Sequence, residues 1–105
     1  MPHPFDLTEA ATTDLEETIA CIAADSVTAA LKVADQLESA FRFLADWPEA
    51  GHHRPDLTND PDLLFWPTGR YLIAYLPSQH PLLILAVFHG SRDIKSLLPR
   101  RLELL

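Results

Sequence analysis

Residues 88–93, with the sequence FHGSRD, bring a histidine, a glycine and an arginine together. A histidine can donate or accept a proton near neutral pH, and an arginine can hold a phosphate group through two parallel hydrogen bonds. Together with Arg70, the pair His89 and Arg92 could supply the proton-transfer group and the cations that a ribonuclease needs. The same residues also fit a structural role, in which His89 satisfies backbone groups at a strand end and Arg92 pairs with an acidic helix residue.

Other residues of chemical interest form weaker patterns. His52 and His53 are adjacent, and neighbouring histidines point apart, so we expect neither a metal site nor a cofactor. The single cysteine, Cys21, excludes an intramolecular disulfide and a cysteine-cluster zinc site. We expect its thiol to be packed within a helix, and Trp47 and Trp66 to be packing residues at the ends of elements.

The helices that would position these residues can be predicted from the spacing of apolar side chains. A short strand is expected at residues 4–7, and Thr8 is suited to cap the helix that follows. Apolar residues then recur at helical spacing on both sides of Asp25 and Ser26. Two helices joined by so short a link form an antiparallel hairpin, which Pro48 and Gly51 should end.

Beyond a proline-rich loop at residues 48–61, the pattern becomes that of strands. We predict strands at residues 63–66, 70–76 and 82–89, in an antiparallel meander because their connections are too short for parallel crossovers. Residues 67–69 should form the first turn. A short helix should close the chain, capped by Ser91 or Asp93 and stopped by Pro99. The prediction is a single α+β domain spanning residues 1–105.

The second and third of these strands are apolar on both faces. Tyr71, Ile73 and Tyr75 share one face, whereas Leu72, Ala74 and Leu76 share the other. The helix hairpin can cover only one of them, so the other face must be covered by something else. Our working hypothesis is that a second polypeptide covers it. The alternative is that residues 93–105 close that face within the same chain.

Composition narrows the class of protein. The chain has 105 residues, 48% of them hydrophobic, and a net charge of -7. Residues 1–62 carry 13 acidic and 3 basic side chains, whereas residues 63–105 carry 2 and 5. Because DNA binding needs a cationic surface, we expect no direct DNA binding by this chain alone. We find no apolar run long enough to span a membrane and no secretory signal, so we expect a cytoplasmic protein.

Several segments together resemble the ParE branch of the ParE/RelE toxin superfamily, whose members are the toxins of bacterial type II toxin–antitoxin systems. Residues 14–17 (DLEE), followed by Ile22 and Ala23, resemble the first helix of the family. Residues 47–51 (WPEAG) resemble the exit of its second helix, and residues 54–57 (RPDL) the following loop. Residues 69–75 (GRYLIAY) and 87–93 (VFHGSRD) resemble its central and last strands.

The resemblance implies a β-α-α-β-β-β order, with a small, mainly antiparallel sheet packed on the helix hairpin and a closing helix after it. It also implies a cognate, ParD-like antitoxin and a hetero-oligomeric complex. The antitoxin tail would bury part of the strand at residues 82–88 or lie in the groove of the helix hairpin.

The resemblance also implies a function in plasmid stabilization and growth arrest. ParE-like members are associated with inhibition of DNA gyrase, which is the function we expect, without enzymatic activity. RelE-like members are ribosome-dependent mRNA endoribonucleases, and His89, Arg70 and Arg92 keep that alternative open. A third possibility is a diverged, non-toxic partner of the antitoxin. Candidate contacts with the antitoxin or the target are Arg70, Tyr71, Leu83, Leu85, His89, Arg92, Lys95, Arg100 and Arg101.

Overall fold

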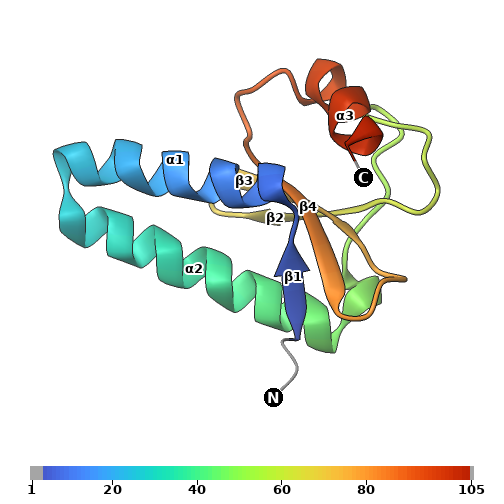
Figure 1. Ribbon diagram of the computed structural model, residues 1–105, viewed down its shortest axis with the longest axis horizontal. Coiled ribbons are helices and arrows are strands. Elements are labelled where there is room, and N and C mark those ends of the chain that lie inside the picture. The colour runs from blue at the N-terminus through green and yellow to red at the C-terminus, as the bar shows by residue number, and fades with distance from the viewer. Residues whose placement is uncertain (1–3, 105) are drawn as a thin grey trace.

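The predicted helix hairpin lies against a four-stranded sheet and extends well beyond it (Figure 1). The computed structural model describes residues 4–104. In chain order the elements are β1 (Phe5–Leu7), α1 (Glu9–Asp25), α2 (Val27–Asp46), the short 3-10 helix η1 (Pro48–Ala50), β2 (Leu64–Thr68), β3 (Tyr71–Leu76), β4 (Leu82–His89) and α3 (Ile94–Glu103). The α+β class and the predicted order of elements are confirmed. No helix within residues 4–104 is both long and apolar enough to cross a membrane.

Hydroxyl side chains begin both helices of the hairpin. The Ala11 N–H donates to Thr8 Oγ1 at 3.1 Å, and the Ala29 N–H donates to Ser26 Oγ at 3.1 Å. Each bond satisfies an amide that the first turn of a helix leaves unpaired. The Thr8 hydroxyl also donates to the Leu85 carbonyl at 3.0 Å. The cap of α1 therefore fixes the start of the helix against β4.

The strands run in the order β1-β4-β3-β2 across the sheet. β2, β3 and β4 pair antiparallel, as the short connections require, and β1 adds a parallel partner to β4. A shift in register between Ala74 and Tyr75 skips Leu85 on the opposite strand, which is the residue whose carbonyl Thr8 binds. β4, the last strand in the chain, therefore lies in the interior of the sheet.

The turn between β2 and β3 differs from the prediction. Pro67 lies inside β2 and not in the turn. A proline is tolerated there because β2 is an edge strand, so no ladder partner needs its missing N–H. The chain reverses at Gly69, whose φ of 56° is in the left-handed region. A Cβ there would also lie 2.9 Å from the flexible Gln36 amide, which can move, so the backbone conformation is what requires glycine.

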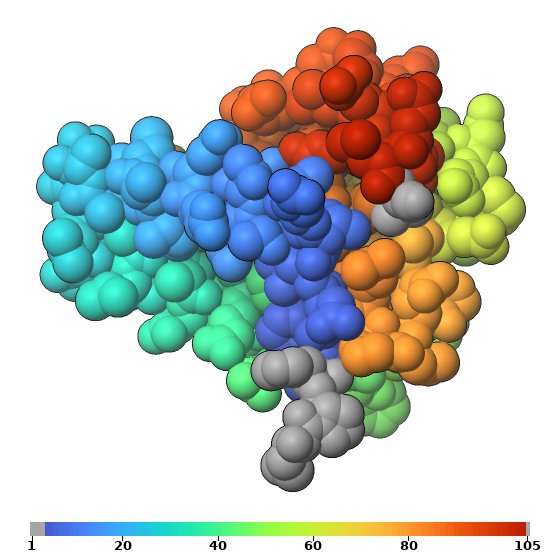
Figure 2. Space-filling model, viewed as in Figure 1, coloured from blue at the N-terminus to red at the C-terminus, as the bar shows by residue number. Residues whose placement is uncertain are grey.

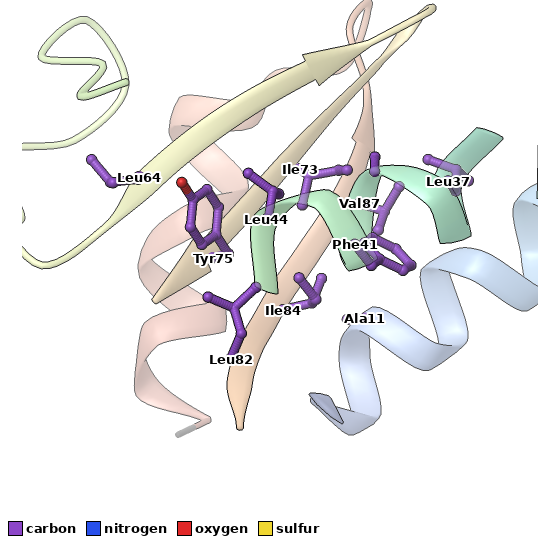
Figure 3. Close-up of a cluster of buried hydrophobic side chains, with 11 residues drawn as sticks. Ala11, Leu37, Phe41, Leu44, Leu64, Ile73, Tyr75, Leu82, Ile84 and Val87 are labelled. Carbon is purple, nitrogen blue, oxygen red and sulfur yellow. The ribbon is translucent and has the colours of Figure 1, made fainter. Parts of the chain in front are cut away.

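The main core lies between the hairpin and one face of the sheet (Figure 3). Leu37, Phe41 and Leu44 project from α2 at helical spacing toward Ile73 and Tyr75 of β3. Each of these five side chains is at most 2% exposed. Burying a side chain of this size stabilises the fold by about 1.5–3 kcal/mol.

The opposite face of the sheet is closed within the chain, which makes our working hypothesis of a second polypeptide there wrong. Ile94 and Leu98 of α3, together with Leu63 from the long loop, cover it. Beneath them, Leu72, Ala74, Leu76, Leu85, Ala86 and Phe88 are each at most 8% exposed. The alternative, closure by the C-terminal segment, is therefore correct, although the sequence did not indicate the contribution of Leu63.

The closing helix also runs further than predicted. α3 continues through Pro99 to Glu103. A proline inside a helix removes one backbone hydrogen bond, but stopping at Pro99 would withdraw the second half of the helix from the sheet. Leu102 and Arg101 lie beyond the proline, and Leu102 packs against the second core. Of the two proposed caps, Asp93 is at the N-cap position, where its carboxylate accepts from the Ser96 hydroxyl at 2.8 Å and makes no bond to a backbone amide.

Candidate functional site

A groove of about 730 Å³ lies between the helix hairpin and the ends of β3 and β4. The structure brings Arg70, His89 and Arg92, the three ribonuclease candidates, to this groove. Arg70 lies in the turn before β3, His89 ends β4, and Arg92 follows in the loop before α3. The Gly90 N–H donates to the Arg70 carbonyl at 2.8 Å, which holds the two chain segments together.

The imidazole of His89 is held by its own loop. The Ser91 N–H donates to His89 Nδ1 at 3.1 Å, and Ser91 Oγ lies 2.6 Å from the same nitrogen. Because a backbone N–H can only donate, this network assigns the lone pair to Nδ1 and the ring proton to Nε2. The ring meets Tyr71 edge-on, with centroids 5.5 Å apart. In this arrangement Nε2 is the hydrogen-bond donor of the His89 ring.

Asp14 and Arg101 form the strongest polar contact of the groove. Arg101 donates to both carboxylate oxygens of Asp14, at 2.6 and 2.7 Å. The Val87 N–H donates to the same carboxylate at 3.0 Å. Asp14 and Arg101 are 14% and 19% exposed, and the hydrogen bonds to Asp14 raise the pKa of Arg101 further above its ordinary value. This contact ties α1, β4 and α3 together; Figure 2 shows the C-terminal segment beside the start of α1.

Sequence reasoning placed the expected ion pair at Arg92, but the structure makes it through Arg101. Within residues 4–104, neither Arg92 nor Arg70 forms an ion pair. In the sequence, Asp14 is part of the segment that resembles the first helix of the family. Its position also predicts a need for a partner, since it lies three residues after the buried Ala11, on the stripe of α1 that faces the core. A carboxylate on such a face is expected to have a partner.

The far end of the groove is apolar. Ile22 of α1 and Val33 of α2 line it and are half-buried. Cys21 lies beside them and is exposed, so the prediction of a packed thiol is wrong. α1 carries its apolar residues toward α2, and position 21 falls outside that stripe. The groove thus combines apolar side chains of the hairpin with arginines near the strand ends, and Asp14 and Glu17 of α1 also line it.

Two of the remaining contact candidates, Tyr71 and Arg101, also line the groove, and the others lie outside it. Leu85 is 1% exposed beneath α3, so a partner could reach it only if α3 moved, and Leu83 is partly buried in the same core. Lys95 and Arg100 are exposed on α3. Arg101 binds Asp14 through its guanidinium. Contacts of these residues with a partner stay predictions.

The two adjacent histidines have separate partners. His52 pairs its backbone with Phe65 and stacks its ring on Trp66, whereas His53 Nε2 lies 3.1 Å from the Pro61 carbonyl. Within residues 4–104, no group of three or more histidine, cysteine or acidic side chains could hold a metal ion.

Comparison with known protein families identifies a match. The model of the family described as "ParE toxin of type II toxin-antitoxin system, parDE" matches residues 5–94. This range begins at β1 and ends at the first residue of α3, so it includes the hairpin, the whole sheet and most of the groove. No match is found among individual curated proteins. With well over half of its sequence matched and the expected order of elements present, the chain belongs to the ParE toxin family of type II toxin–antitoxin systems.

Proposed function

We propose that residues 1–105 act as one toxin domain that inhibits DNA gyrase in the bacterial cytoplasm and is neutralised by a ParD-like antitoxin. The family match supports the toxin role. The observation that favours inhibition over RNA cleavage is the state of His89. Its Nδ1 lone pair accepts from Ser91, and the other ring nitrogen carries the proton. A general base needs a free lone pair, so His89 would have to give up these bonds before it could act as one.

The groove is the surface we propose for the antitoxin tail. Its apolar end, at Ile22 and Val33, suits the apolar side of an amphipathic segment, and Arg70 and Arg92 suit carboxylates further along that segment. Complex formation would then be hetero-oligomeric and salt-dependent. Reversing both charges, with Arg70→Glu and Arg92→Glu, should weaken antitoxin binding more than the same change at Lys95 and Arg100, which lie outside the groove.

Purified protein and gyrase holoenzyme test the target. We expect the wild-type chain to block supercoiling of relaxed plasmid, to leave translating mRNA intact and to cause growth arrest when produced without antitoxin. Full supercoiling at a large excess of the chain would refute gyrase inhibition. Absence of growth arrest would favour the third possibility, a diverged antitoxin-binding partner that has lost toxicity.

Ribosome-dependent RNA cleavage remains the second candidate because Arg70, His89 and Arg92 do meet at one groove. If that reading is correct, His89→Ala should abolish cleavage of translating mRNA. The control is Ser91→Ala, which frees His89 Nδ1 from the serine hydroxyl and keeps the imidazole. A ribonuclease should keep or gain activity with Ser91→Ala, whereas a gyrase inhibitor should cut no mRNA in either form.

A further inference from the structure

Trp47 is a large apolar side chain that the fold holds out in solvent. It is 65% exposed at the end of α2, although the sequence predicted a packing role for it. Phe43, one helical turn earlier, is 40% exposed, and both residues line an open hollow with Pro48 and Ala50. Trp66, by contrast, packs as predicted, with its ring centroid 5.1 Å from that of Phe43. We call Phe43, Trp47 and Trp66 the aromatic patch.

The turn that carries Trp47 is fixed by a buried tyrosine. The Tyr75 hydroxyl donates to the Pro48 carbonyl at 2.6 Å and accepts from the Gly51 N–H at 2.9 Å. A Cβ at Gly51 would collide with that hydroxyl and lie 2.8 Å from the Phe65 carbonyl, so the close approach requires glycine. The backbone beside Trp47 is therefore fixed. A partner that binds there orders less of the chain than it would on a loose loop.

Two carboxylates border the aromatic patch. Asp46 and Glu49 line the same hollow, on either side of Trp47 in the sequence. Neither takes part in an ion pair with another residue of the described chain, positions 4–104. An aromatic face beside free carboxylates is complementary to an arginine, which can stack on the ring and donate to the acid. The surface fits a protein segment that presents an arginine among apolar side chains.

We infer that the aromatic patch, with Asp46 and Glu49, is the surface that contacts gyrase, through an arginine-bearing apolar segment of that enzyme. The inference rests on the proposed function and adds to it a second surface, separate from the groove. None of the residues lining the hollow lines the groove, so gyrase and the antitoxin tail would use different residues, although α2 contributes to both surfaces.

The test compares Trp47→Ala with Leu31→Ala. Leu31 is a matched control, because it is 64% exposed on the same helix and lines neither surface. We expect Trp47→Ala to raise the concentration that half-inhibits gyrase supercoiling by at least about tenfold, as for an interface hot spot. Leu31→Ala should not change it. The thermal midpoint and co-purification with the antitoxin encoded beside the toxin should stay at wild-type values.

A second variant, Asp46→Asn with Glu49→Gln, removes both charges without changing side-chain volume. It should weaken gyrase inhibition and reduce its dependence on salt concentration, and it serves as the test if Trp47→Ala fails to fold. Unchanged inhibition in either folded variant overturns the inference while leaving gyrase inhibition standing. Loss of antitoxin binding also overturns it, because the patch would then belong to the antitoxin. If the wild-type chain does not inhibit gyrase, the proposed function itself fails.

Discussion

At the residue scale, Tyr75 shows how one hydroxyl can set a surface. The strand pattern predicted which face of the sheet this side chain occupies, and the structure confirms it. Its partners, Pro48 and Gly51, lie 27 and 24 residues away in the chain. No periodicity within a strand encodes such distant hydrogen bonds, so these two bonds of the Tyr75 hydroxyl could not be predicted. His89 does bind a backbone group at the strand end, as its structural role predicted, but spacing alone did not identify Ser91 as the partner, because that bond depends on the loop conformation.

The buried Tyr75 hydroxyl predicts that the protein loses stability at alkaline pH. Burial raises the pKa of the Tyr75 hydroxyl above its ordinary value of 10.0, although the hydrogen bond from Gly51 opposes the shift. Above pH 10 the unfolded chain therefore loses this proton while the folded chain keeps it, so the free energy of unfolding falls as pH rises. Urea titrations at pH 8 and pH 11 should show that the free energy of unfolding falls less between these pH values in Tyr75→Phe than in wild type.

The control for this prediction is Tyr71→Phe, which should retain the wild-type loss of stability between the two pH values. At pH 8, Tyr75→Phe itself should lower the free energy of unfolding by about 1–3 kcal/mol, because it leaves the Pro48 carbonyl and the Gly51 N–H without their partner. An identical pH dependence in all three proteins would contradict the assignment to Tyr75.

At the element scale, local signals were accurate where a cap or an apolar stripe defines an element and failed where a tertiary contact decides. Thr8 and Ser26 begin the two helices as predicted. Pro67 and Pro99 were both expected to end elements, and neither does. In each case the surroundings remove or offset the usual cost of the N–H that proline lacks. The edge of the sheet needs no N–H from Pro67, and the second half of α3 has contacts to keep beyond Pro99.

The position of α3 depends on Asp14, and this can be measured. Asp14→Ala removes the partner of Arg101 and the acceptor of the Val87 N–H together. We expect the free energy of unfolding to fall by roughly 3 kcal/mol, because a largely buried charge and an amide lose their partners. Asp14→Asn keeps an oxygen that can accept from the Val87 N–H, so it should lower the free energy of unfolding by less than Asp14→Ala does. Equal stability of all three proteins in urea would show that the contact does not hold α3.

At the scale of the whole molecule, the sequence indicated that the sheet has two apolar faces and correctly assigned the hairpin to one. It did not decide what covers the other, because α3 is short and interrupted by a proline. The structure shows that leucines at the C-terminal end have unequal roles. Leu98 is 1% exposed in the second core, whereas Leu104 is 66% exposed.

This difference predicts the outcome of a pair of substitutions on one helix and its cap. Leu98→Ala should lower the free energy of unfolding by about 2–5 kcal/mol, the range for a cavity in a packed core. Leu104→Ala should change it by no more than about 0.5 kcal/mol. Leu98→Ala should also increase the fluorescence of a dye that binds apolar surface, as α3 loosens from the sheet. Equal effects of the two changes would mean that α3 does not close the second core.

The interior position of β4 has a consequence for how the toxin is made. β4 pairs with β1 at one edge and β3 at the other, yet it is the last strand to leave the ribosome. A nascent chain that stops before residue 82 has no strand to join its two ends and cannot assemble the groove. Synthesis interrupted before that point therefore cannot yield the folded domain, which assembles only once β4 has been translated.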